Sequence, residues 1–280
     1  EIMPSLVGSE MCIRDRNTPA GMHLSIMVQE ILDFLQIQPG QTGFDATLGY
    51  GGHTKAMLAC LEGRGHIYAT DVDPEESAKT KKRLLEQGYG EEILTIKLQN
   101  FCTIDEIAKE AGGFDFVLAD LGVSSMQIDN PERGFSFKVE GPLDLRLNQK
   151  EGISAAERLD TITKEELAGM LYENSDEPYS EELAKSITDE IRRGNRMDTT
   201  KKLRDVIEKT LMFLPEKERK DTVKKTCQRV FQALRIDVNN EFEVLYEFME
   251  KLPECIKPGG RAAILTFHSC LLYTSDAADD

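Results

Sequence analysis

The sequence predicts an α/β fold in which a parallel sheet is interrupted by an all-helical insertion. Three patterns support this prediction. Apolar stretches of strand length alternate with helical patterns between residues 22 and 119. The segment 155–239 then has helical periodicity and no good strand candidate, and a strand pattern returns at 262–267. Alternating strands and helices are typical of parallel sheets with right-handed crossovers.

The first half of the chain carries the alternating elements. Ile26, Ile31, Leu32 and Leu35 lie near helical spacing, and Pro39-Gly40 ends that helix. We expect helices at 22–35, 53–61, 75–87 and 104–110, and strands at 43–48, 66–71, 93–98 and 114–119.

In the second half, residues 127–152 are rich in Pro, Gly and charge and are expected to form a loop. Thr199-Thr200 is a plausible start for a helix over 201–211. The α/β pattern resumes with a helix at 242–252, a turn at 258–260 (Pro-Gly-Gly) and the strand at 262–267. We therefore expect an α/β domain formed by 21–128 and 240–269, and a helical insertion at 129–239.

The two ends do not continue these patterns. Residues 1–20 lack clear periodicity and the regions of a signal peptide, and 270–280 extend no preceding element. Both resemble translated adapter sequence at the end of a gene fragment. We therefore expect foreign tails at both ends and the absence of the last strands of the sheet.

Composition limits the class of protein. At 280 residues the chain suits one large α/β domain or a domain with an insertion. No window approaches the roughly 18 apolar residues of a membrane span. The six cysteines form no CxxC pair and the four histidines are dispersed, so no metal site is expected. Reduced thiols favour a cytoplasmic location.

Charge is unevenly distributed. The net charge of −16 argues against a nucleic-acid partner. Residues 191–235, however, contain 14 Lys/Arg and 6 Asp/Glu, a local balance of +8, which leaves −24 for the rest. The segment fits either an RNA-binding module or a solvated helical face.

A glycine-rich loop follows the strand at 43–48. Asp45, Gly49, Gly51 and Gly52 lie where small residues let the backbone approach a nucleotide-like ligand. Asp71 ends the next strand, 22 residues after Gly49, where a carboxylate can accept both hydroxyls of a ribose. The dinucleotide fingerprint is incomplete because Thr54 occupies its third glycine position. The alternative is an ordinary turn, with Asp71 as a helix cap.

A second loop follows the strand at 114–119. Asp120 comes directly after an apolar run and is followed by Ser124 and Ser125, which offer donors and acceptors to an exocyclic amine. Ligands bind outside the carboxyl ends of strands in open α/β sheets. We expect a site here, although a simple capping loop is the alternative.

Two further candidates lie near the end of the chain. Arg229, Gln232, Arg235 and Asn239 share or adjoin one helix face, which is either a wall of the site or a solvated surface. His268 follows the strand at 262–267, a place where most lone histidines are structural.

Taken together, these stretches resemble the bacterial small-subunit ribosomal RNA (cytosine-N4) methyltransferases. The matching motifs are Gly51-Gly-His53, Asp71-x-Asp73-Pro74, Asn100-Phe101, Asp120-Leu-Gly-Val-Ser-Ser125 with Gln127, Asp129-x-Pro131-Glu-Arg-Gly-Phe-Ser-Phe137, Gly141-Pro-Leu-Asp-Leu-Arg146, Phe231-Gln-Ala-Leu-Arg-Ile236 with Val238-Asn239 and Glu241, and Pro258-Gly-Gly260 leading to Phe267-His-Ser269. They span residues 23–269 in the family's order, and the 120–137 and 231–236 blocks are highly specific.

The resemblance implies a Rossmann-like class I methyltransferase sheet, S-adenosylmethionine as cofactor and methylation of a decoding-region cytidine in 16S rRNA. It implies that the helical insertion, 129–239, recognises the substrate. The implied cofactor-binding residues are Gly51, Gly52, His53, Asp71, Phe101, Asp120 and Gln127. Asp120 and Ser124 are the candidates for activating the amine, and Asp144, Arg146 and Arg235 for binding the substrate. The implied partner is 16S rRNA or the small ribosomal subunit, with a homodimer left open.

Departures from the family pattern keep other functions open. Residues 172–180 differ from the family's usual segment, which suggests a divergent paralogue with a shifted target. The residues after 269 also differ from it, and so does the opening at 23–27. The alternatives are a methyltransferase of another RNA or of a small molecule, a nicotinamide dehydrogenase, and an RNA-binding assembly factor without catalysis.

Overall fold

Five parallel strands form the central sheet of the computed structural model, which describes residues 25–266. Their order is β3-β2-β1-β4-β5, so β1 lies between β2 and β4. The strands are β1 (Thr42–Asp45), β2 (His66–Asp71), β3 (Leu94–Leu98), β4 (Phe114–Asp120) and β5 (Ile256–Leu265). The expected foreign tails, the further strands and His268 lie outside the described residues. The predicted α/β class is confirmed.

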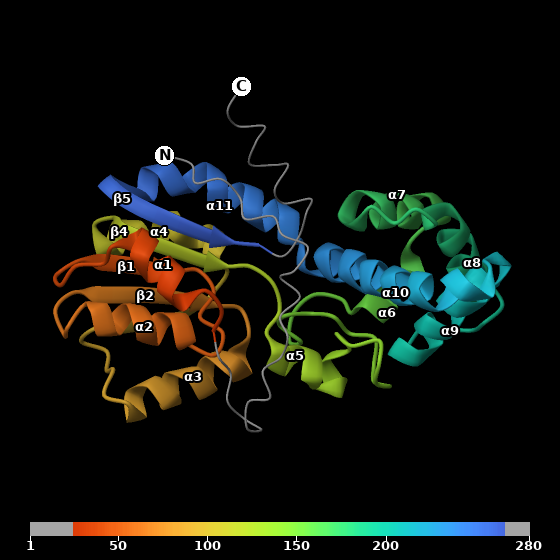
Figure 1. The fold of residues 1–280 in the computed structure, drawn as a ribbon, viewed down its shortest axis with the longest axis horizontal. Helices are drawn as coiled ribbons and strands as arrows, with labels where there is room; N and C mark the ends of the chain where they lie inside the picture. The colour runs from red at the N-terminus through yellow and green to blue at the C-terminus, as the bar shows by residue number, and fades with distance from the viewer. Residues whose placement is uncertain (1–24, 267–280) are drawn as a thin grey trace.

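Both faces of the sheet are buried, which explains the apolar runs in its strands. In β4, Phe116 and Leu118 face one core cluster while Val117 and Ala119 face the other. The first face is covered by α1 (Val28–Leu35), α2 (Gly52–Cys60) and α3 (Pro74–Glu86). The second is covered by α4 (Ile104–Ala111) and α11 (Glu241–Cys255), as Figure 1 shows.

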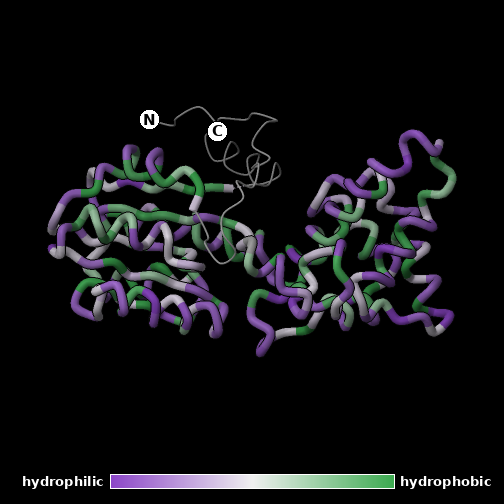
Figure 2. Tube along the Cα trace, turned by 60° about the horizontal axis from the view of Figure 1, so that its bottom comes forward, coloured by the Kyte–Doolittle hydropathy of each residue, from purple (hydrophilic) through white to green (hydrophobic). Residues whose placement is uncertain are grey.

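The insertion has a hydrophobic core of its own. It contains α6 (Ala155–Thr161), α7 (Lys164–Ser175), α8 (Ser180–Arg192), α9 (Thr200–Thr210), the short 3-10 helix η3 (Leu211–Phe213) and α10 (Glu216–Asn239). Its core residues come from 135–234 and include none from the sheet. In Figures 1 and 2 these helices lie beside the α/β body, and α10 runs toward it. The helical character expected for 155–239 is confirmed, whereas the domain boundaries themselves stay a prediction.

Capping side chains mark several helix starts that the sequence indicated. Thr199 accepts a hydrogen bond from the backbone N–H of Lys202 at the start of α9, as expected. Asp73 caps α3, whose first residue is Pro74. Proline suits this position because the first helical N–H groups have no intrahelical partner.

The structure corrects three expectations. Residues 258–260 do not form a turn before the strand, because β5 already runs from Ile256 to Leu265. The pairing of β5 with β4 has a register irregularity between Phe114 and Phe116, and Gly259 takes φ +82° in this part of β5. The first helix begins only at Val28, because Met27 is left-handed. The expected loop at 127–152 is not wholly irregular, since α5 (Ser125–Asp129) extends into it and η2 (Pro131–Arg133) lies within it.

One close approach in the sheet yields a stability prediction. A Cβ added to Gly43 would lie 2.0 Å from the ring of Phe116, which is fully buried. We expect Gly43→Ala to lower the free energy of unfolding by about 1–3 kcal/mol through overpacking. Urea denaturation would measure the change.

Gly169 in α7 is the matched control, because a Cβ there meets no atom within 4 Å. Gly169→Ala should stabilise the protein by up to about 1 kcal/mol, since alanine loses less backbone entropy in a helix. Equal unfolding midpoints for the two variants would contradict the packing described for Gly43.

Candidate active site

Three carboxylates lie at the carboxyl edge of the sheet. Asp45, Asp71 and Asp120 are the last residues of β1, β2 and β4. The chain order reverses between β1 and β4, and ligands of open α/β sheets bind at that point. The fold therefore brings together the two loops that the sequence singled out.

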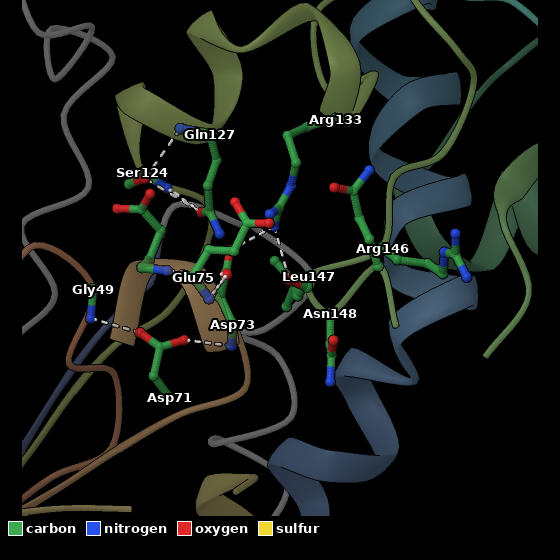
Figure 3. Close-up of polar contacts among 12 residues, drawn as sticks. Gly49, Asp71, Asp73, Glu75, Ser124, Gln127, Arg133, Arg146, Leu147 and Asn148 are labelled. Atoms are coloured by element: carbon green, nitrogen blue, oxygen red, sulfur yellow. Dashed lines mark hydrogen bonds and ion pairs between the residues drawn. The ribbon is translucent and has the colours of Figure 1, made fainter. Parts of the chain in front are cut away.

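The Asp71 carboxylate is held by backbone donors. Its Oδ2 accepts from the N–H of Gly49 at 2.9 Å, and its Oδ1 accepts from the N–H of Asp73 at 2.8 Å (Figure 3). Burial raises the pKa of Asp71 to about 6, against the lowering effect of these hydrogen bonds. Each oxygen retains a lone pair, so this carboxylate fits a ligand with two neighbouring hydroxyls.

Side chains of α3 contact the glycine loop and support it. Gly51 takes φ +79°, and a Cβ there would lie 2.7 Å from Thr80. The hydroxyl of Thr80 donates to the carbonyl of Gly49 at 2.6 Å, and Arg83 donates to the carbonyl of Tyr50 at 2.8 Å. Gly52, the other glycine expected to bind cofactor, begins α2. The loop is thus a preformed turn in which Gly51 and Gly52 have no room for a side chain of their own.

Asp45 is an internal anchor. It is 1% exposed and accepts from the hydroxyl of Thr54 at 2.6 Å and from the N–H of Thr47 at 3.0 Å. Burial raises the pKa of Asp45. Thr54, which breaks the glycine fingerprint, therefore has a structural role in holding this carboxylate.

The side chains of Asp120 and His53 lie in contact with each other. His53 Nε2 lies 3.3 Å from Asp120 Oδ2, without hydrogen-bond geometry. The Asp120 side chain is 27% exposed, whereas that of His53 is 9% exposed. The backbone N–H of Asp120 donates to the hydroxyl of Thr47 at 2.7 Å, which ties the ends of β4 and β1 together. The backbone of Asp120 is thus fixed in place, and its side chain remains partly open to solvent.

Ser124 and Gln127 form hydrogen bonds with each other. The Ser124 hydroxyl accepts from the Gln127 N–H, and Gln127 Oε1 accepts from the Ser124 N–H at 2.9 Å, a capping box for α5 (Figure 3). These two side chains therefore cap α5, as the alternative interpretation of this loop expected. Asp120 is not part of the capping box. Phe101 follows β3 and packs edge-on against Phe248.

The predicted substrate residues are engaged within the protein. Asp144 and Arg146 form a two-pronged ion pair with both contacts at 2.8 Å, and Arg146 also donates to the carbonyl of Gly152. Arg235 pairs in the same way with Glu241, joining α10 to α11. Their roles in substrate binding stay predictions.

Two further residues of α10 that the sequence indicated are also engaged. Asn239 donates to the carbonyl of Leu145, and Arg229 lies 3.8 Å from the buried Glu177. Glu177 belongs to the 172–180 segment that departs from the family pattern. In this structure, that face of α10 is mainly a support for neighbouring loops.

Sequence reasoning missed two site residues, Asp73 and Arg133. Their side chains form a buried ion pair with Nη2 and Oδ2 2.7 Å apart. Asp73 lay in a quoted motif, and the Asp-Pro pair signalled a helix cap. Nothing local indicated that Arg133, 60 positions later in the sequence, would be its partner.

Residues 25–266 contain neither a candidate metal site nor a helix that could span a membrane. This part of the chain has no group of three or more His, Cys, Asp or Glu side chains placed to hold a metal ion. None of its helices has the length and apolar composition needed to cross a membrane.

The parallel sheet, the glycine loop after β1 and the acceptor ending β2 define an α/β enzyme that binds a nucleoside-containing cofactor. The model of the MraW methylase family matches residues 20–271, and the chain belongs to that family. It is therefore a methyltransferase that uses S-adenosylmethionine. The expected enzyme class and cofactor are confirmed, and the dehydrogenase alternative is excluded.

Close relatives support the same family. The ribosomal RNA small subunit methyltransferase H 1 of Agathobacter rectalis is 80% identical over 260 residues, which cover 93% of this chain and 74% of the relative. The protein of that name from Lachnoclostridium phytofermentans is 69% identical, with 93% and 71% covered. Ribosomal RNA small subunit methyltransferase H of Fusobacterium nucleatum is 39% identical, with 88% and 76% covered.

The Asp71 contacts predict a pH dependence of cofactor binding. Ribose hydroxyls donate to the ionised carboxylate, whose pKa is about 6 in the protein. Affinity should be constant above about pH 7 and should fall as pH drops through 6, by at most about tenfold per unit. Calorimetric titration with S-adenosylhomocysteine between pH 5 and 8 measures this.

Asp71→Asn is the diagnostic variant. It should bind about 10–100-fold more weakly at pH 7.5, because a hydrogen bond to a charged group is lost, and its affinity should vary less with pH. Asp33→Asn, on the exposed face of α1, should behave as wild type. An unchanged pH profile in Asp71→Asn would refute the assignment of Asp71 to the ribose.

Proposed function

We propose that the enzyme methylates the exocyclic N4 of a cytidine in the decoding region of 16S rRNA. The names of its close relatives support a ribosomal RNA substrate. The observation that carries the proposal within this chain is Asp120, a positioned and partly exposed acceptor at the β4 end. A hydrogen-bond acceptor at this place suits an amino group, because the N–H bonds of an amino group can donate to it.

The chain's residues meet the chemical demands of this reaction. The N4 lone pair of cytosine is delocalised into the ring, so the amine is a poor nucleophile. The Asp120 carboxylate would accept a hydrogen bond from N4 and hold the base in line, and orientation of this kind contributes several kcal/mol. When bound, S-adenosylmethionine supplies the electrophilic methyl group. Gly51, Gly52 and Asp71 would hold it at the β1 and β2 ends.

The RNA must present an unpaired base. A cytidine within a helix has to be unstacked at a cost of a few kcal/mol, whereas an incompletely folded subunit exposes it more readily. We therefore propose that the partner is 16S rRNA within the small ribosomal subunit or its precursor, in the cytoplasm. One chain contains both the cofactor loop and Asp120, and a homodimer stays a separate proposal.

A basic groove in the insertion supports RNA binding. A cavity of about 840 Å³ lies between α9 and α10, beside the 137–138 segment. Lys138, Lys220 and Lys224 line it, and in residues 25–266 their ammonium groups have no ion-pair partner. Its acidic lining residues are Asp205, Glu208 and Glu216, the first two close to Arg204. The unpaired ammonium groups suit phosphate oxygens.

A methyl-transfer assay tests the role of Asp120. We expect Asp120→Asn to lower turnover by at least about tenfold and to change RNA affinity much less, because the variant loses the charged acceptor. Transfer of radiolabelled methyl to small-subunit RNA, followed by nucleoside analysis, measures turnover and identifies the base. A labelled base other than cytosine would disprove the N4 assignment.

Ser124→Ala is the comparison variant in the same loop. Since Ser124 caps α5, its loss should cost about 1 kcal/mol of local stability, and turnover should fall less than in Asp120→Asn. If Ser124→Ala lost more turnover than Asp120→Asn, the hydroxyl rather than the carboxylate would be the activating group.

Salt dependence tests the groove. Replacing Lys138, Lys220 and Lys224 with Ser should weaken RNA binding and reduce the slope of log affinity against log salt by up to about two. A matched control replaces Lys201, Lys217 and Lys225, which carry the same charge in the insertion but do not line the cavity. Equal slopes in the two triple variants would mean that the segment acts only as a diffuse positive surface.

A further inference from the structure

Arg133 connects the α/β body to the loop that carries the predicted substrate residues. Its guanidinium lies 2.7 Å from Asp73 Oδ2 and donates to the carbonyl of Leu147 at 2.7 Å (Figure 3). The Arg133 side chain is 7% exposed and that of Asp73 is 1% exposed. Two charges removed from water in this way depend on each other, because either one alone would be buried without compensation.

On the cofactor side, Asp73 acts directly on Asp71. The N–H of Asp73 donates to Asp71 Oδ1, and the carboxylate of Asp73 accepts from the N–H groups of Glu75 and Glu76. The same residue therefore orients the ribose acceptor, caps α3 and pairs with Arg133. A shift of Asp73 would move a hydrogen bond of the cofactor site.

On the opposite side, Arg133 restrains residues 143–147, here called the 143–147 loop. The carbonyl of Arg133 accepts from the N–H of Leu145, and Leu145 is buried in the left-handed conformation with φ +65°. This conformation is unfavourable for a residue with a Cβ and persists only where surrounding contacts impose it. Asp144 and Arg146 flank Leu145, so their ion pair depends on this restraint.

We propose that Arg133 is a positioning residue that couples occupancy of the cofactor site to the order of the 143–147 loop. Ligand binding at Asp71 fixes Asp73, and Asp73 fixes the Arg133 side chain. The Arg133 guanidinium holds Leu147, and the position of the Arg133 backbone in turn sets the hydrogen bond from Leu145. Coupling between two sites is reciprocal, so RNA bound at the loop would tighten cofactor binding by the same factor. That the loop contacts RNA rests on the proposed function, whereas its coupling to the cofactor does not.

Hydrogen exchange of the full chain tests the coupling without RNA. With saturating S-adenosylhomocysteine, the amides of Leu145 and Leu147 in the wild type should exchange about tenfold more slowly. In Arg133→Met, this protection should disappear even though the cofactor product still saturates its site, as calorimetry would verify. Protection of equal size in Arg133→Met, or none in the wild type, would overturn the proposal.

Three more variants separate positioning from general stability. Asp73→Asn keeps a good helix cap but removes the charge, so it should also lose the protection. It therefore tests the coupling if Arg133→Met does not fold. Arg133→Lys keeps the charge without the forked geometry and should restore part of it. Arg158→Met removes a 2.8 Å ion pair with Asp237 inside the insertion and should leave the protection intact. Loss of protection in Arg158→Met to the same extent would mean that the effect is only structural.

A second measurement adds RNA. S-adenosylhomocysteine should change the affinity for a decoding-region RNA fragment about tenfold in the wild type. In Arg133→Met and Asp73→Asn it should change this affinity little, and to a similar extent in both variants. Absence of RNA binding by a wild type that shows the exchange protection would reject the proposed function but keep the coupling. RNA binding without any exchange protection would reject the coupling alone.

Discussion

The parallel pairing of β1 with both β2 and β4 is the constraint on which the site depends. Asp45 is in register with Ala69 on one side and with Leu118 on the other. Beyond it, the chain bonds alternately to the two neighbours: the N–H of Ala46 donates to Leu118, and that of Leu48 donates to Thr70. The start of the glycine loop is therefore fixed at the carboxyl edge of the sheet, between the ends of β2 and β4.

Burial of charge at this edge is selective. Asp45 and Asp73 are each 1% exposed and have partners within the protein, a threonine hydroxyl in one case and an arginine in the other. Asp71 and Asp120 keep acceptor capacity. The difference is physical, because a desolvated carboxylate without partners is costly. Asp71 and Asp120, which are less buried than Asp45 and Asp73, are therefore the carboxylates available to a ligand.

Local patterns predicted most of the fold. The apolar run of β4, the strand at His66–Asp71 and the threonine cap of α9 each depend on neighbours in sequence, and each was predicted. The path of β5 was not, because its irregularity depends on pairing with β4 rather than on Pro-Gly-Gly alone. The predictions for Asp144 and Arg146 likewise could not include their mutual pairing, and Arg133 gave no local signal of contact with Asp73.

The attachment of the insertion has a consequence for how this fold can vary. A crossover from β4 to the parallel β5 must leave from the carboxyl edge, and α11 begins at that edge after the insertion. The insertion is therefore an enlarged β4–α11 connection, which leaves the sheet at the end of β4. Segments can be lengthened, shortened or exchanged there without changing the register of any strand. Such changes would leave the cofactor site in place, because that site is formed by the ends of the strands.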